Sequence, residues 1–204
     1  MTKSNGLSTA TTAGIILAAG TASRMGNDKL LLPFKGLPLV QHVVNAARNS
    51  HLSSVTVVLP EHSRLEEHLS LTGCTVAYSI NRKDGQAESL KTGLQNIPPQ
   101  MQGVMVLLGD LPLIRTATIN HLLTVFSNSP DHWIIPRHQA IRGNPVTIPS
   151  SYFTKILNLS GDTGARPLLT LSDTPKRMVE LDDVGPFFDI DTPQQYAMLL
   201  NNYE

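Results

Sequence analysis

Two glycines and two cations stand close together near the start of the chain, in the stretch LAAGTASRMGNDK from Leu17 to Lys29. Gly20 and Gly26 allow backbone conformations that turn N–H groups towards an anion, and Arg24 adds a charged donor beside Lys29. An apolar run precedes the stretch, and ligands of α/β proteins gather at the carboxyl ends of strands. The pattern indicates a polyphosphate-binding loop, while a strand-to-helix turn with two surface cations is equally compatible with it.

The spacing of this stretch excludes two common phosphate-binding motifs. RMGNDK lacks the Gly-Lys-Ser/Thr end of a P-loop, and its glycines fall short of the three that a G-x-G-x-x-G dinucleotide fingerprint needs. The sequence also contains no Gly-x-Ser-x-Gly elbow and no H-x-x-x-H pair. Covalent serine catalysis and a histidine zinc site therefore have no support.

Three aspartates stand where a divalent cation is expected. Asp110 directly follows the apolar run GVMVLLG, and Asp189 and Asp191 alternate about Ile190 in FFDIDTP. In an extended segment these two carboxylates share one side while Ile190 packs inward. Mg²⁺ is commonly held by one or two carboxylates, with phosphate oxygens and water. Asp191 has a competing role as a helix cap, with Thr192 as the alternative cap, so we expect Asp189 to be the better ligand.

A second polar stretch, RKDGQAESLKTG, joins a predicted strand to a predicted helix through Gly85. Gln86, Glu88 and Ser89 fall in the first helical turn, where amide and hydroxyl groups could discriminate the edge of a nucleobase. Gln86 and Glu88 could equally satisfy the free N–H groups at the start of the helix. The residues alone leave both interpretations open.

Composition limits the classes of protein to consider. The chain has 204 residues, 41% of them hydrophobic, so we expect one domain over 13–204 after a flexible segment over 1–12. Sixteen basic and sixteen acidic side chains balance, which favours neither nucleic acid nor an anionic membrane as a partner. Cys74 is the single cysteine, which fits a reducing, cytoplasmic compartment. We find no secretory signal and no stretch near the ~20 apolar residues that span a bilayer.

Alternating strands and helices are predicted over the first two thirds of the chain. Apolar runs without polar alternation are typical of parallel strands covered on both faces, and a helix is the simplest crossover between such strands. The predicted strands are 13–19, 53–60, 75–80, 103–112 and 131–136, and the predicted helices are 37–50, 62–71, 86–97 and 116–129.

This order predicts an α/β fold with a mostly parallel, doubly wound sheet and 103–112 as its central strand. Phe126 and Trp133 are predicted core residues. After Pro136 the pattern weakens and Gly, Pro and Asp become more frequent, so this part is expected to supply substrate loops, with one clear helix over 194–203.

Seven motifs together resemble the nucleotidyltransferases that mature the molybdenum cofactor, most closely their cytidylyltransferase branch. From about Gly14 to the C-terminus they are LAAGTASRMGNDK, GLPLV, GQAESLKTGL, GDLP, RGNPV, GDTGAR and FDIDTP. The resemblance implies a Rossmann-like three-layer α/β/α nucleotidyltransferase fold. It also implies Mg²⁺-dependent transfer of a nucleoside monophosphate from a triphosphate to the phosphate of molybdopterin, with release of pyrophosphate.

The resemblance also implies roles for individual residues. Those implied to line the nucleotide are Leu17, Ala18, Ala19 and Gly20, with Gly85 and Ser89 near the base. Those implied to act on the phosphates and the metal are Arg24, Lys29 and Asp110, with Asp189 or Asp191 as the second Mg²⁺ ligand. Those implied to face the pterin are Arg142, Asn144, Asp162 and Arg166.

The choice of base and acceptor leaves alternatives open. Guanylyl-transferring relatives usually carry glycine where this chain has Ala19, and the extra methyl group narrows the space for a purine, which favours CTP. The alternatives are a guanylyltransferase, a sugar-phosphate or isoprenoid-precursor nucleotidyltransferase, and a non-catalytic escort that delivers cofactor to a molybdenum or selenium-dependent hydroxylase. The motifs RGNPV and GDTGAR argue against a sugar-phosphate or isoprenoid-precursor nucleotidyltransferase. The retained cations and acids argue against the non-catalytic escort. A molybdenum hydroxylase is also a possible recipient of the finished cofactor.

Overall fold

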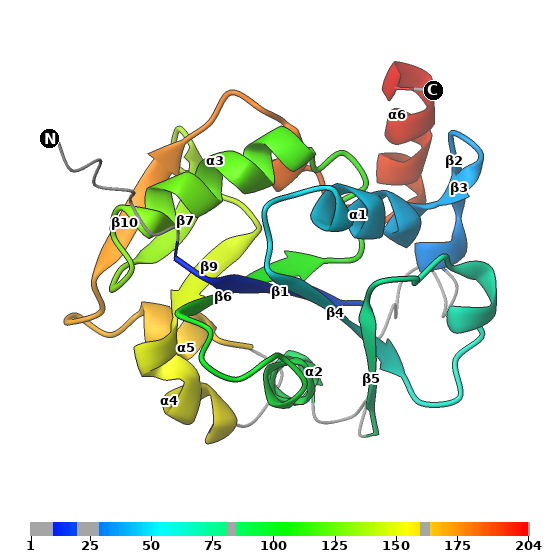
Figure 1. Cartoon of the computed structure of the whole chain (residues 1–204). Helices are drawn as coiled ribbons and strands as arrows, with labels where there is room; N and C mark the ends of the chain where they lie inside the picture. Colours follow the sequence, from blue (N-terminus) through cyan, green and yellow to red (C-terminus); the bar gives the residue numbers. More distant parts are fainter. Residues whose placement is uncertain (1–9, 20–28, 81–84, 160–163, 204) are drawn as a thin grey trace, which may run out of the picture.

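A computed structural model describes residues 10–19, 29–80, 85–159 and 164–203, and a mostly parallel sheet forms its centre (Figure 1). The strand order is β10-β7-β9-β6-β1-β4-β5, with β8 paired to β7. The pairs β1–β4, β1–β6, β4–β5 and β7–β10 are parallel, whereas β9 is antiparallel to both β6 and β7. The strands are β1 (Thr12–Leu17), β4 (Ser54–Pro60), β5 (Thr75–Ser79), β6 (Gly103–Leu108), β7 (Trp133–His138), β8 (Ile141–Arg142), β9 (Val146–Pro149) and β10 (Lys176–Glu180).

Helices cover both faces of the sheet and make three layers (Figure 1). On one side lie α1 (Leu39–Arg48) and α3 (Thr116–Ser127), and on the other lie α2 (Gly85–Gln95), α4 (Phe153–Leu157) and α5 (Arg166–Leu169). Successive strand residues point to opposite faces, so Ile16 packs in the core cluster of α1 and α3 while Ile15 packs in that of α2 and α4. The predicted α/β fold and its mostly parallel sheet are confirmed, with β6 in the middle of the strand order.

The predicted helix over 62–71 is wrong. The structure has only a 3-10 turn at Glu66–His68. His62 has a φ of +57°, which breaks helical geometry at the predicted start. Leu65 is the one buried side chain of residues 62–71, so no continuous apolar stripe packs a longer helix against the core.

The expectation of little regular structure after Pro136 is also wrong in part. β9 lies inside the sheet between β6 and β7, and α4, α5 and β10 follow it. β9 is four residues long, and it pairs with β6, which lies much earlier in the chain, as well as with β7. Such pairing leaves no local periodicity for sequence to reveal. The predicted C-terminal helix is confirmed as α6 (Pro193–Tyr203).

The described chain begins with residues that are tied to the sheet. Of the segment predicted to be flexible, residues 1–9 lie outside the described residues. The Ala10 N–H donates to Ser127 Oγ at 3.2 Å, and the Thr11 N–H donates to Gln102 Oε1 at 3.0 Å. The chain is therefore anchored just before β1. Among the described helices none is long and apolar enough to cross a membrane.

A third, smaller core cluster attaches α6 to a hairpin formed by β2 (Pro33–Phe34) and β3 (Leu37–Pro38). Its buried members are Phe34, Leu39, Ile190 and Leu199. The Tyr196 hydroxyl adds a 2.6 Å hydrogen bond to the Pro33 carbonyl. In Figure 1 α6 and the β2–β3 hairpin lie next to α1. It fixes Ile190, and with it the FDID segment.

Gly93 sets the distance between α2 and the sheet, and its replacement gives a first prediction. A Cβ at this position would lie 2.4 Å from Ile15 Cγ2 and 3.1 Å from Val58 Cγ2. Overpacking of this kind costs about 1–3 kcal/mol, more than the roughly 1 kcal/mol that alanine gains over glycine in a helix. We expect Gly93→Ala to lower the urea midpoint of unfolding. Gln95→Ala, on the exposed side of the same helix, is the control, and an unchanged midpoint for Gly93→Ala would contradict the packing argument.

Candidate active site

The carboxyl ends of β1 and β6 bring the first predicted site residues together. The two strands are parallel and pair Leu17 with Leu108. Past the strand ends, the Gly109 N–H donates to the Leu17 carbonyl at 3.0 Å. A Cβ at Gly109 would lie 3.2 Å from that same carbonyl, so the approach is close. Asp110 therefore emerges beside the end of β1, at the edge of the sheet where ligands gather in α/β proteins.

The FDID segment reaches the same edge through its backbone. The Ile190 N–H donates to the Asp110 carbonyl at 3.0 Å, and the Ile190 side chain is fully buried. Because neighbouring side chains of an extended segment point to opposite sides, Asp189 and Asp191 turn away from the core. The alternation predicted from the sequence is confirmed for Ile190, and three carboxylates meet beside the end of β6.

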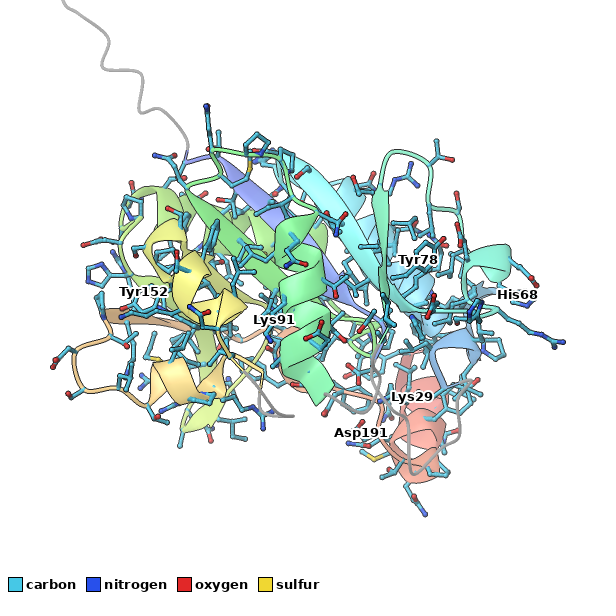
Figure 2. All side chains as sticks on the ribbon, turned by 90° about the horizontal axis from the view of Figure 1, so that it is seen from below. Lys29, His68, Tyr78, Lys91, Tyr152 and Asp191 are labelled. Atoms are coloured by element: carbon cyan, nitrogen blue, oxygen red, sulfur yellow. The ribbon has the colours of Figure 1, made fainter. Side chains whose placement is uncertain are left out.

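Lys29 lies between two of these carboxylates. Its Nζ is 2.8 Å from Asp110 Oδ2 and 2.7 Å from Asp191 Oδ1. The side chains of Lys29 and Asp110 are 12% and 19% exposed. The side chain of Asp191 is 47% exposed, so Asp191 lies on the solvent side of these three residues. Figure 2 shows Lys29 and Asp191 beside α6. Lys29 opens a 3-10 turn (Lys29–Leu31) whose next residue, Leu30, is buried in the α1 core.

The electrostatics of this group favour a positive charge at its centre. Burial alone would lower the pKa of Lys29, but the charge and hydrogen bonds of Asp110 and Asp191 outweigh it and raise the pKa above its ordinary value. The pKa of Asp189 is raised, first by burial and then by the charges of Asp191 and Asp110 against the opposing effect of a backbone hydrogen bond. Ionised Asp189 is therefore disfavoured until a further cation is near.

Asp110 offers a donor atom that fits a divalent cation. Its Oδ2 accepts from Lys29, while its Oδ1 is buried and has no hydrogen-bond partner among the described residues. An orphaned carboxylate oxygen beside a raised-pKa aspartate suits a hard cation, which commonly takes one or two carboxylates together with phosphate oxygens and water. Within the described ranges, no group of three or more His, Cys, Asp or Glu side chains is arranged to hold a metal by itself.

The capping role weighed for Asp191 is wrong, because Thr192 caps α6. The Gln195 N–H donates to Thr192 Oγ1 at 3.2 Å, and the Thr192 N–H donates back to Gln195 Oε1 at 2.8 Å. This reciprocal pair is a capping box, with Pro193 at the first helical position. Asp191 is left to pair with Lys29.

The residues expected near the nucleotide lie along the same edge. Leu17 ends β1 and is half-buried, while Ala18 and Ala19 follow it and are buried. Gly85 begins α2 with a φ of +75°, a conformation that glycine adopts without strain. Ser89 is buried, and its Oγ lies 3.5 Å from Ser79 Oγ at the end of β5, so its hydroxyl faces the sheet.

Both interpretations of the first turn of α2 stay predictions. Glu88 lies 3.5 Å from Lys91, three residues further along the helix, in an ion pair. Gly20, Arg24 and Asp162 lie outside the described residues.

A cavity of about 320 Å³ brings together three residues that were predicted to face the acceptor. Arg142, Asn144 and Arg166 all line it, although they come from β8, the loop before β9 and the start of α5. Leu17 and Leu108 line the same cavity, so its wall continues to the strand ends that precede the carboxylates. Most of the remaining lining is apolar.

A short turn connects the cavity with the carboxylates. The Asn144 N–H donates to the Pro186 carbonyl at 2.9 Å, and a Cβ at Gly143 would lie 2.5 Å from that oxygen. On its other side, Gly185 lies so close to Leu113 that a Cβ would be 2.4 Å from the Leu113 carbonyl. Only glycine allows these approaches without displacement. The turn Gly185–Phe187 is thereby held between the cavity loop and the loop after Asp110, three residues before Ile190.

Sequence reasoning missed two contributors to this site. Gly143 belongs to the RGNPV stretch expected on the pterin side, but its need for close backbone contact is invisible without the partner segment. Trp133 was predicted to be core and is indeed fully buried, but it also lines the cavity. Its indole N–H, which needs a hydrogen-bond partner when buried, was the available signal.

Comparison with known proteins supports a nucleotidyltransferase. Residues 14–179 match the profile of the MobA-like NTP transferase domain. Purine catabolism protein PucB of Bacillus subtilis is 31% identical over 201 residues, covering 91% of this chain and 94% of its own. Molybdenum cofactor cytidylyltransferase of Escherichia coli is 25% identical, covering 93% and 95%.

A solved structure resembles the whole fold. Rv0371c from Mycobacterium tuberculosis superposes with a TM-score of 0.83 at 26% identity, covering 95% of this chain and 98% of its own. A further crystal structure of Rv0371c, described as a complex with manganese, gives a TM-score of 0.81 at 25% identity and covers 94% and 99%.

The raised pKa of Asp189 predicts a pH-dependent effect on stability. Because the folded-state pKa lies above the ordinary value of 3.8, the stability that Asp189 contributes is full below pH 3.8 and is lost as the pH rises through the folded-state pKa. At neutral pH the ionised carboxylate of Asp189 therefore lowers the stability of the fold. We expect Asp189→Asn to raise the urea midpoint at pH 7 in buffer with a chelator, with a gain that shrinks towards pH 4.

Asp182→Asn, at an exposed position of the same segment, is the matched control. If Asp189→Asn raised the urea midpoint equally at both pH values, or lowered it at pH 7, ionised Asp189 would not destabilise the fold and the argument from its raised pKa would be contradicted.

Proposed function

The chain belongs to the MobA-like NTP transferase family, and on this premise we propose that it transfers CMP from CTP to the phosphate of molybdopterin. The products are the cytosine dinucleotide form of the cofactor and pyrophosphate. The reaction class comes from the family, whereas the base, the acceptor and Mg²⁺ as the metal are the parts proposed. The 25% identity to a molybdenum cofactor cytidylyltransferase over nearly the whole chain supports this choice.

One structural observation supports the acceptor most strongly. The side chains of Arg142 and Arg166 line the same cavity and have no hydrogen-bond or ion-pair partner in the part of the chain that the structure describes. Arg137 pairs with Glu180 and Arg115 pairs with Asp183. Two unpaired guanidinium groups at a mostly apolar cavity suit an acceptor that carries phosphate on a large ring system.

The proposed reaction needs alignment and charge neutralisation, and no protein nucleophile. An oxygen of the acceptor phosphate attacks the α-phosphorus of CTP, a new P–O bond forms, and the bond to the leaving pyrophosphate breaks. The cavity wall continues from Arg142 to Leu17 and Leu108, so an acceptor held there has its phosphate near the strand ends. Lys29, released from the carboxylates, donates to the departing phosphates together with Arg24.

Asp110, with Asp189 or Asp191, would hold the metal ion. A bound Mg²⁺ supplies charge neutralisation at the phosphates. Asp110 Oδ1, which has no partner among the described residues, would be available to such a cation, whose charge would compensate for the departure of Lys29.

Similarity to PucB bears on what happens to the product. That relative is named for purine catabolism and has the higher identity of the two curated relatives reported above. We propose that the finished cofactor is delivered to a molybdenum hydroxylase that acts in purine breakdown. A cytoplasmic location fits both the NTP supply and a chain with one cysteine.

The experiment that tests the function offers the protein Mg²⁺, molybdopterin-type cofactor and each of CTP, GTP, ATP and UTP in turn. We expect pyrophosphate release and a cytosine dinucleotide product with CTP above the other three. Preference for GTP would make the protein a guanylyltransferase. Tight nucleotide binding without product from any triphosphate would favour the escort or another acceptor, such as a sugar phosphate.

Base selectivity gives a prediction at Ala19. Its side chain is buried in the core cluster that includes Leu90 of α2, so its methyl group helps to fix the distance between β1 and the helix expected near the base. Removing the methyl group gives a purine more space. Ala19→Gly is therefore expected to raise kcat/KM for GTP relative to CTP, measured in competition. An unchanged ratio would remove this explanation of CTP preference.

The two unpaired arginines give a separate prediction. Arg142→Ala and Arg166→Ala each remove a charge-assisted contact to the acceptor, which is worth roughly 1.5–3 kcal/mol. We expect the KM for the acceptor to rise roughly tenfold or more and the KM for CTP to stay unchanged. Arg177→Ala, an exposed arginine on β10 whose Nη1 donates to Ser129, is the control. Equal effects on both KM values would argue against an acceptor site here.

A further inference from the structure

The ammonium group of Lys29 already serves as a counterion for the carboxylates of the site. Its Nζ lies 2.8 Å from Asp110 Oδ2 and 2.7 Å from Asp191 Oδ1. Both contacts have the length of charge-assisted hydrogen bonds. In Figure 2 Lys29 and Asp191 lie next to each other beside α6. The carboxylate proposed as the first metal ligand is therefore paired with a cation of the protein itself.

Three separately anchored segments meet at this ammonium group. Asp110 follows the end of β6, and Asp191 belongs to the FDID segment, which the buried Ile190 holds in place. Lys29 begins a 3-10 turn whose next residue, Leu30, is buried. The side chains of Lys29 and Asp110 are 12% and 19% exposed, so salt in the solvent screens this pair less than a surface pair.

A divalent cation on the same carboxylates must compete with Lys29. Bonds from Mg²⁺ to oxygen ligands are about 2.0–2.1 Å long, so an ion on Asp110 Oδ2 or Asp191 Oδ1 would lie close to the ammonium group. Like charges at such a separation repel one another strongly. Asp110 Oδ1 has no partner among the described residues, but it belongs to the same carboxylate, so an ion there is also near Lys29. Binding of the metal alone is consequently opposed while Lys29 keeps its place.

Phosphate groups of a nucleotide would give Lys29 another partner. The lysine ammonium binds phosphate as a point charge, and its flexible four-carbon stem allows the charge to move while the backbone stays in its turn. Once the ammonium has moved, the carboxylates attract a metal ion instead. Metal and nucleotide then raise the affinity for each other, and linkage requires the same factor in both directions.

We propose that Lys29 couples metal binding to nucleotide binding, because its ammonium group excludes a divalent cation from the Asp110 carboxylate until nucleotide phosphates draw it away. This inference rests on the proposed function, because it takes Asp110 as a metal ligand. It adds an order of binding: the protein alone binds a divalent cation weakly, and the metal enters together with the triphosphate.

Binding of Mn²⁺ without nucleotide tests the proposal. Free Mn²⁺ is measured from its electron paramagnetic resonance signal with the wild type, Lys29→Met and Lys29→Arg. Methionine keeps much of the length of lysine and removes the charge. We therefore expect Lys29→Met to bind Mn²⁺ roughly 5- to 150-fold more tightly than the wild type, the usual range for coupling between two sites. Lys29→Arg retains a cation and should bind Mn²⁺ as weakly as the wild type does.

Lys35→Met is the matched control for net charge. Lys35 is exposed and lies over the Phe34 ring in the neighbouring hairpin, away from the carboxylates to which Lys29 binds. We expect its replacement to leave the affinity for Mn²⁺ unchanged. Equal affinities in the wild type and Lys29→Met would overturn the proposal. An equal gain in Lys35→Met would overturn it too, because the gain would then reflect net charge alone.

A folding defect in Lys29→Met would not prevent the test. A metal that binds only the folded state stabilises it, so Mn²⁺ should raise the urea midpoint of Lys29→Met more than that of the wild type. An equal rise in both would overturn the proposal.

The wild type also gives a direct measurement. With ¹³C-labelled lysine, the Cε resonance of Lys29 is assigned by its absence from Lys29→Arg. We expect this resonance to shift with Mg²⁺ and a non-hydrolysable CTP analogue together, and to stay in place with the same concentration of Mg²⁺ alone. A shift to the nucleotide-bound position with Mg²⁺ alone would overturn the proposal, as would no shift with both ligands bound.

Failure of this inference is distinguishable from failure of the proposed function. CMP transfer to molybdopterin by the wild type, with equal Mn²⁺ affinities in the wild type and Lys29→Met, would overturn the coupling and leave the function standing. Tighter Mn²⁺ binding by Lys29→Met without CMP transfer to molybdopterin by the wild type would support the coupling and overturn the proposed reaction.

Discussion

The ammonium group of Lys29 holds two carboxylates together at the carboxyl edge of the sheet, and the arrangement of the site depends on it. Asp110 and Asp191 both contact this ammonium group, and their charges help to raise the pKa of the nearby Asp189. Without a cation at this point the carboxylates would repel one another, and only backbone contacts such as Ile190 N–H to the Asp110 carbonyl would join the loop after β6 to the segment before α6. In the reaction proposed above, a divalent cation takes the place of that ammonium group, and Lys29 then contacts the phosphates instead of the carboxylates.

Strand pairing and apolar packing bring these carboxylates together. Parallel pairing of β1 with β6 places Gly109 and Asp110 beside the end of β1, and the cluster around Phe34 and Leu199 buries Ile190 so that its two aspartates face outward. The turn Gly185–Phe187 then links the FDID segment to the cavity loop through backbone contacts that exclude a side chain at Gly143. The cavity and the carboxylates are consequently parts of one edge of the sheet, which suits the proposed transfer between two bound phosphates.

Features with a local cause could be predicted from the sequence. The apolar runs that become β1 and β6, the alternation of Asp189, Ile190 and Asp191, and the helix at the C-terminus all follow from spacing. Features with a distant cause could not. β9 pairs with β6, which lies much earlier in the chain. The burial that would have held a helix over 62–71 is missing because most of that segment faces solvent. The capping box of Thr192 and Gln195 was visible in TPQQ, and it would have freed Asp191 for Lys29.

The central claim is that the Asp110 group is where metal and nucleotide phosphates meet. Pulsed electron paramagnetic resonance of Mn²⁺, with the protein and a non-hydrolysable CTP analogue, tests it most directly. The account predicts protein-bound Mn²⁺ with phosphorus coupling from the nucleotide in the wild type, and loss of that species in a folded Asp110→Asn variant. An Asp110→Asn protein that gives the same signal at the same affinity would contradict the account, because the metal would then be held elsewhere.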